Sequence, residues 1–90
     1  MKLTEFTYTK ANGDVSERAV IVTQEPTKLL SGIDVSDLPE LEFATFIQDM
    51  RELKNRQHQE LMDLMAKHDL KHNFRQFSSD KMTNIQSEWV

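Results

Sequence analysis

The first part of the chain has the residue pattern of two β-strands joined by a tight turn. Residues 2–9 (KLTEFTYT) are rich in Thr, Phe and Tyr, and residues 15–23 (VSERAVIVT) are rich in Val and Ile. Asn12 and Gly13 lie between them. Asn-Gly is the strongest short-range signal for a β-hairpin, because both central positions of a type I′ turn need positive φ. The pattern therefore predicts an antiparallel hairpin over residues 2–23.

A two-residue turn would also set the register of this hairpin. Ala11 would face Asp14, and Phe6 would lie opposite Ala19. One face would then collect the better core residues, which are Phe6, Tyr8, Val15, Ala19 and Ile21. The other face is polar at one end, where Arg18 lies, and apolar at the other. The second strand is therefore expected to be central in its sheet, with its far half covered on both sides.

Turn-forming residues separate the hairpin from a long helical pattern. Residues 24–38 hold one proline and the second glycine, which predicts a connecting loop. The segment SDLPE then combines capping residues with a proline in the first turn, which is typical of a helix start. Residues 40–70 contain no Gly or Pro, and apolar residues recur there at steps of three and four. This spacing predicts a helix over residues 39–70.

The helical pattern is interrupted by a polar stretch at residues 54–60 (KNRQHQE), about two turns without an apolar side chain. We favour one long helix, which would run roughly 45–48 Å and project beyond a domain of this size. Its second half would expose Leu61, Leu64 and Met65 unless a second copy or a partner covered them. The alternative is a break near Asn55, which would fold the segment into two antiparallel helices.

The end of the chain, residues 72–90, allows two secondary structures. HNFRQF is typical of a strand. The following SSDKMTNIQSEWV has apolar residues at helical spacing, yet it also alternates as a strand with Thr83, Ile85 and Ser87 on one face. Together, the patterns predict a single α+β domain over residues 1–90. In it, a small antiparallel sheet made of the hairpin and a C-terminal strand packs on one long helix.

Composition narrows the class of protein. Ninety residues suffice for one globular domain with a thin margin of stability. The chain has no cysteine, which excludes disulfides and cysteine-bound zinc. Its net charge is −4, whereas most nucleic-acid-binding proteins carry an excess of basic residues. This charge is more typical of a protein that binds another protein. No apolar run resembles a signal peptide or a membrane span, so we expect a soluble, cytoplasmic protein without a membrane partner.

The hairpin and the tail resemble the two ends of WYL-type domains. The residues that carry the resemblance are Gly13, Ser16, Arg18 and Val20, which follow the G-x-S-x-R-x-V pattern of these domains with one additional residue after the glycine, and Arg75 and Phe77, in an R-x-F element. The resemblance implies a small barrel-like sheet. It also implies that Arg18 and Arg75 lie near a pocket for a nucleotide or another anionic ligand.

Candidate chemistry is sparse. His68 and His72 are four residues apart, and two histidines at this spacing on one helix face can bind zinc. Because a zinc site needs three or four protein ligands, we expect no metal. No serine has the glycine elbow of a nucleophile, and phosphate-binding loops are absent. Carboxylates alternate with Lys and Arg along the helical segment, which is typical of a solvated face. We therefore expect neither enzymatic activity nor a cofactor.

These patterns predict a small regulatory protein, of the inhibitor or adaptor type, that acts on a protein partner through its helix and one sheet face. Its size and acidity suit a phage or bacterial accessory factor. The residues expected to bind the partner, or a second copy in a homodimer, are Met50, Leu53, Arg56, Leu61, Leu64 and Met65. The alternative is a module that binds an anion, a nucleotide or single-stranded nucleic acid through Arg18, Arg75 and Phe77.

Overall fold

The computed structural model describes residues 2–24, 28–53 and 58–90. In chain order the elements are β1 (Lys2–Thr9), β2 (Val15–Gln24), β3 (Leu29–Asp34), α1 (Glu40–Arg51), α2 (His58–Lys67), β4 (Phe74–Ser78), the 3-10 turn η1 (Ser79–Lys81) and β5 (Met82–Trp89). The predicted α+β class is confirmed. Within the described residues, however, the sheet has five antiparallel strands rather than a hairpin plus one, and two helices replace the single one.

β1 and β2 form the expected antiparallel hairpin through a longer turn than predicted. The Lys10 N–H donates to the Asp14 carbonyl at 2.7 Å, and the Gly13 N–H donates to the Lys10 carbonyl at 2.9 Å. Three residues therefore form the loop, and Gly13 supplies the left-handed conformation with a φ of 90°. The side-chain oxygen of Asn12 accepts the Asp14 N–H at 3.0 Å, which holds the extra loop residue in place.

The longer turn shifts the hairpin by one residue, so the predicted register is wrong. Phe6 lies opposite Arg18 rather than Ala19. Because side chains alternate between the two faces of a strand, this shift exchanges the faces of β2 relative to β1. Phe6 shares its face with Val20, and Ile21 lies on the opposite face, which carries the helices. β2 is the third of five strands, so its predicted central position is confirmed.

The predicted connecting loop, residues 24–38, contains strand β3, which the glycine and proline pattern did not indicate. β3 pairs with β2, with Gly32 opposite Val22 and a register shift directly after that pair. A Cβ atom at Gly32 would lie 2.8 Å from Val20 Cγ1 and would overlap the carbonyl oxygen of Ile21. Glycine is therefore required here for the close approach of two strands, not for a loop.

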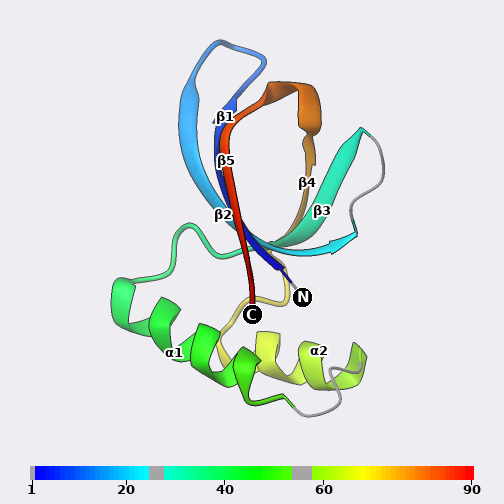
Figure 1. The fold of residues 1–90 in the computed structure, drawn as a ribbon. Helices are drawn as coiled ribbons and strands as arrows, with labels where there is room; N and C mark the ends of the chain where they lie inside the picture. The colour runs from blue at the N-terminus through cyan, green and yellow to red at the C-terminus, as the bar shows by residue number, and fades with distance from the viewer. Residues whose placement is uncertain (1, 25–27, 54–57) are drawn as a thin grey trace.

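The sheet is strongly curled. Its strand order is β4-β3-β2-β1-β5, so β4 and β5 are its two edges. The ring centroids of Phe6 on β1 and Phe77 on β4 lie 5.2 Å apart. Three strand spacings in a flat sheet would separate them by about 14 Å. The concave face that results, visible in Figure 1, encloses a core made of Phe6, Val20, Val22, Leu30, Phe77 and Met82.

The segment predicted as one helix over residues 39–70 forms two helices, so the long projecting helix is wrong. α1 begins directly after Pro39, within one residue of the predicted start, but Pro39 is itself the N-cap and no side chain caps the helix, so the predicted capping by the preceding polar residues is wrong. The break that the alternative placed near Asn55 falls outside the described residues. α2 runs back along α1 on the same side of the sheet (Figure 1), and this buries Leu64 and Met65. Each such burial stabilises the fold by about 1.5–3 kcal/mol, which a straight helix would forgo.

The helix pair packs on the convex face of the sheet and forms the larger core. This core combines Leu3, Ile21, Ile33 and Val35 of the sheet side with Phe46, Ile47, Met50, Leu64 and Met65 of the helices, and it is closed by Leu70 and Val90. In the part of the chain that the structure describes, no helix has the length and apolar character of a membrane span.

Residues 72–90 form two strands joined by a short turn, so the strand interpretation of the tail is confirmed and the helical one is wrong. β4 pairs with β3, with Phe77 opposite Leu30. β5 pairs with β1, with Ser87 opposite Thr4. The turn η1 therefore carries the chain from one edge of the sheet to the other edge.

Candidate protein-interaction edge

The edge strand β5 is anchored at its two ends and exposed between them. Met82 enters the concave core, and Val90, directly after the strand, enters the core against the helices. Every residue from Thr83 to Trp89 is exposed, including Ile85 at 54% and Trp89 at 79%. The fold thus holds the strand in place while its central part faces solvent.

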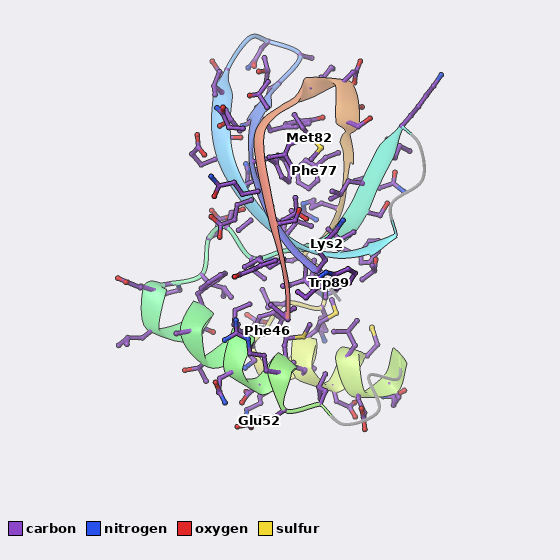
Figure 2. All side chains as sticks on the ribbon, in the orientation of Figure 1. Lys2, Phe46, Glu52, Phe77, Met82 and Trp89 are labelled. Carbon is purple, nitrogen blue, oxygen red and sulfur yellow. The ribbon has the colours of Figure 1, made fainter. Side chains whose placement is uncertain are left out.

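One side of β5 is apolar. Ser87 lies opposite Thr4, and the two hydroxyl groups hydrogen bond at 3.0 Å. Ile85 and Trp89 are two residues away from Ser87 in either direction, so they share its side of the strand. Trp89 pairs with Lys2 at the end of β1, where Figure 2 shows both side chains. This side therefore presents two exposed apolar side chains around a small serine.

The other side of β5 is polar and acidic. Gln86 pairs with Glu5, and Glu88 pairs with Leu3, so both carboxylates lie on this side of the β1–β5 pair. A hollow of about 170 Å³ there is lined by Leu3, Glu5, Gln86, Ser87 and Glu88. Neither carboxylate has an ion-pair partner within the described residues.

β5 carries little of the protection that edge strands usually have. Edges are commonly blocked by lysine, proline or a bulge. β5 has no lysine or proline, and Glu88 is its one charged residue. Its irregularity lies near the start, where Asn84 has a φ of 54° and the register with β1 shifts between Glu5 and Thr7. Residues 85–89 remain regular and exposed, and we refer to them as the open edge.

The edge formed by β4 is more restricted. β4 is five residues long. The Arg75 guanidinium donates to the carbonyl oxygens of His72 and Phe74 at 2.9 and 3.3 Å. Arg75 thus occupies backbone acceptors at the start of its own strand, which leaves fewer of them for an added strand.

Arg18, which the family resemblance places near a ligand pocket, is held in a polar network between β2 and β3. Its Nη1 lies 3.2 Å from the Asp34 carboxylate, and its Nε donates to the Ser16 hydroxyl at 3.2 Å. Asp34 also accepts hydrogen bonds from the N–H and the hydroxyl of Ser36, and the Ser36 hydroxyl accepts the Ala19 N–H. The network connects the two strands, which accounts for Arg18 without a ligand.

The register places Arg75 on the same sheet face as Arg18. Arg75 faces Gly32, Gly32 faces Val22, and Val22 is an even number of residues from Arg18. The two guanidinium groups nevertheless have different partners, Asp34 for one and backbone carbonyls for the other. Neither arginine lines the hollow beside β5 or a second hollow beside η1, which is formed by Lys28, Leu29, Ser78, Ser79 and Asp80.

Phe77, the third residue assigned to a ligand, is buried in the concave core. Its ring meets Phe6 and Tyr8 edge-on, with centroid distances of 5.2 and 5.1 Å. Figure 2 shows Phe77 and Met82 inside the curl of the sheet. Stacking on a base requires an exposed ring face, and the buried Phe77 does not offer one.

The helix residues predicted to bind a partner belong largely to the protein's own core. The described ones are buried or half-buried there: Met50, Leu53, Leu61, Leu64 and Met65. Arg56 lies outside the described residues. The three-and-four spacing therefore marked a core stripe on two helices, and these side chains leave little apolar surface for a partner.

His68 and His72 do not share a helix face, because α2 ends at Lys67 and Asp69 has a left-handed φ of 58°. His68 is buried, and its Nε2 lies 3.1 Å from the Asp49 carboxylate, which also accepts a hydrogen bond from Lys67 at 3.0 Å. These hydrogen bonds lower the pKa of Asp49. The cluster connects the end of α2 to α1. The described residues contain no group of three or more side chains placed to hold a metal ion.

The sequence indicated alternation in the tail but not the open edge. Thr83, expected on one side with Ile85 and Ser87, instead pairs with Thr7 on the acidic side. The irregularity at Asn84 causes this change of phase. The one local signal of an unprotected edge was the strand pattern of residues 82–89, which contains no lysine or proline. Its position at an edge depends on pairing with β1 at the opposite end of the chain.

No protein-family model matches the sequence, and neither a curated protein nor a solved structure matches it. The similarity to WYL-type domains stays a prediction. The functional interpretation therefore rests on the geometry of the open edge.

Proposed function

We propose that this chain is a non-enzymatic regulatory protein that binds an extended segment of a partner protein as an additional strand beside β5. The observation that carries the proposal is the open edge, an anchored strand with Ile85 and Trp89 exposed on one side. An edge strand presents unpaired N–H and C=O groups at strand spacing. An added strand satisfies these groups, and contacts with alternate side chains provide specificity.

Trp89 would supply much of the binding energy. A tryptophan side chain buries about 150–250 Å² when it is fully covered. Since Trp89 is 79% exposed, covering its ring would remove on the order of 150 Å² from water. That area corresponds to about 4 kcal/mol before the cost of ordering the partner. Tryptophan is also enriched among the residues that dominate protein interfaces.

The absence of enzymatic activity is part of the proposal. Among the described residues, the His68–Asp49 pair is the arrangement that most resembles acid–base machinery. The His68 ring, however, is buried edge-on against Phe46, with a centroid distance of 5.2 Å. A catalytic base has to reach its substrate, so this burial supports a structural role in joining the helices.

The alternative function, binding of an anion or single-stranded nucleic acid, is supported by the common sheet face of Arg18 and Arg75. Their existing partners and the net charge of −4 weaken it. Fluorescence anisotropy with single-stranded DNA and RNA at low salt tests it directly. Binding that is lost in the Arg18→Ala, Arg75→Ala double variant would favour this alternative over the interaction proposal.

A library of random displayed peptides, selected on the folded chain, tests the proposed function. We expect enriched peptides to shift the amide NMR signals of residues 85–89 and the fluorescence of Trp89, the only tryptophan. Trp89→Ala and Ile85→Ala should weaken binding. Leu41→Ala is the matched control, because Leu41 is an apolar residue on α1 that is 85% exposed. Selection of no peptide, or of peptides whose affinity is unchanged by the two open-edge variants, would contradict the proposal.

A further inference from the structure

The two sides of the open edge impose a pattern on any strand that pairs with it. Residues that face each other across a strand pair point to the same side of the sheet. Partner residues opposite Ile85, Ser87 and Trp89 would therefore lie on the apolar side. Partner residues opposite Gln86 and Glu88 would lie on the acidic side. The side chains of the partner segment must alternate accordingly.

The acidic side favours positively charged partner side chains. Glu88 lies on β5 itself, and Glu5 lies beside Gln86 on β1, so the two carboxylates are diagonal neighbours around the hollow. A lysine or arginine opposite Glu88 would lie next to its carboxylate, and one opposite Gln86 would lie diagonal to Glu88 and two strand spacings, about 10 Å, from Glu5. Opposite charges that face each other across strands are favourable, and like charges are unfavourable. The net charge of −4 also attracts a basic segment at a distance.

We infer that the open edge binds an extended partner segment in which apolar residues alternate with lysine or arginine. The inference rests on the proposed strand addition and specifies its partner. The apolar side chains cover Ile85 and Trp89, and the basic ones lie beside Glu88, with the charge of Glu5 on the next strand adding to the attraction.

A second copy of this chain is the competing occupant. Antiparallel pairing centred on Ser87 would place Ile85 opposite Trp89 of the other copy. The same pairing would gather Glu5 and Glu88 from both copies on one side of the sheet. This accumulation of negative charge disfavours self-pairing relative to a basic segment.

Three synthetic peptides of equal length test the inference, with valine alternating with lysine, serine or glutamate. Titration is followed by Trp89 fluorescence at low salt. The lysine peptide should bind about tenfold more tightly than the serine peptide, and the glutamate peptide more weakly than either. The difference should shrink as salt is raised. N-methylation of alternate amides should abolish binding of the lysine peptide, because it removes donors from the strand pairing.

A charge-reversed protein gives the second measurement. The Glu5→Lys, Glu88→Lys double variant should prefer the glutamate peptide over the lysine peptide. A reversed preference also demonstrates that the variant is folded. The matched control is Glu52→Lys with Asp63→Lys, which changes the net charge equally at two exposed positions, one directly after α1 and one on α2. The control should keep the preference for lysine.

The outcomes separate the inference from the proposed function. Equal binding of all three peptides, with loss of binding in Trp89→Ala measured by isothermal titration calorimetry, would overturn the basic pattern and leave strand addition standing. Failure of every peptide to bind would overturn both. Because the chain has no cysteine, Ser87→Cys reports self-pairing, with Ser79→Cys as control. Both should stay monomeric under mild oxidation. A disulfide-linked dimer of Ser87→Cys alone would show that a second copy occupies the edge and would overturn the inference.

Discussion

Met62 and Met65 lie three residues apart on α2 and provide a matched test of how the helices pack. Met65 is 3% exposed in the core between the helices and the sheet, whereas Met62 is 37% exposed. Replacement of methionine by alanine changes the intrinsic helix propensity equally at both positions. A difference between the two variants therefore measures burial, and with it the contact of α2 with the sheet.

Met65→Ala should lower the free energy of unfolding by about 2–4 kcal/mol. Loss of a fully buried methionine side chain forfeits about 1.5–3 kcal/mol of transfer free energy, and the cavity left behind adds to this. A chain of 90 residues has a total stability of about 5–13 kcal/mol. The variant should therefore lose a large fraction of it, and its Tm should fall by roughly 10–25 °C. Met62→Ala should cost less than about 1 kcal/mol.

Urea unfolding followed by far-UV circular dichroism measures both variants, since Trp89 is too exposed to report on the core. Equal destabilisation by the two variants would refute the folded-back position of α2. So would a change of less than about 0.5 kcal/mol in Met65→Ala. The projecting helix, with its apolar residues free for a partner, would then become the better interpretation.

Three further predictions concern the polar groups and the close approach of strands. Gly32→Ala should lower the free energy of unfolding by about 1–3 kcal/mol, because the added Cβ would overlap the Ile21 carbonyl. An unchanged urea midpoint would contradict the close approach of β2 and β3 at this position. Carboxyl NMR should find the pKa of Asp49 below its ordinary value of 3.8, chiefly because of the hydrogen bond from His68. A carboxylate whose pKa is lower in the folded state stabilises the fold at pH values above its unfolded pKa, and this stability is lost as the pH falls through the folded pKa. When the pH is lowered below about 4, the Asp49→Asn variant should therefore lose less stability than the wild type does. Equal loss of stability in the two proteins would count against the pairing of Asp49 with His68. Arg18→Ala should lower the stability measured by thermal unfolding by about 1–2 kcal/mol, because it removes the partner of the buried Asp34 carboxylate. An unchanged Tm would instead favour the ligand-binding role of Arg18.

Local signals in the sequence predicted where elements begin but not how they pair. The Asn12-Gly13 turn and the Pro39 helix start both lie where expected. The register failed because the Asn12 side chain accepts the Asp14 N–H and supports a loop one residue longer. β3 was missed because Gly32 resembles a loop residue, whereas its small size is required by contact with β2.

The helix pattern could not distinguish a core from an interface. Apolar residues at steps of three and four are the same whether a helix packs on its own sheet or on a partner. The polar stretch at residues 54–60 was compatible with a continuous helix and with a turn. Burial of Met50, Leu64 and Met65 in one core with the sheet decides between these possibilities, and only long-range packing contains that information.

Folding and the proposed binding use different residues of β5. Met82 and Val90 belong to the two cores and hold the strand, whereas Ile85 and Trp89 contribute little buried area to the fold. The fold therefore does not require the latter two to be apolar, and exposed apolar side chains promote aggregation unless a partner covers them. The two cores use both faces of the central strand β2. Neither core covers the middle of β5, although pairing with β1 holds this part of the strand in an extended conformation. An ordered but uncovered edge strand is the condition that strand addition requires.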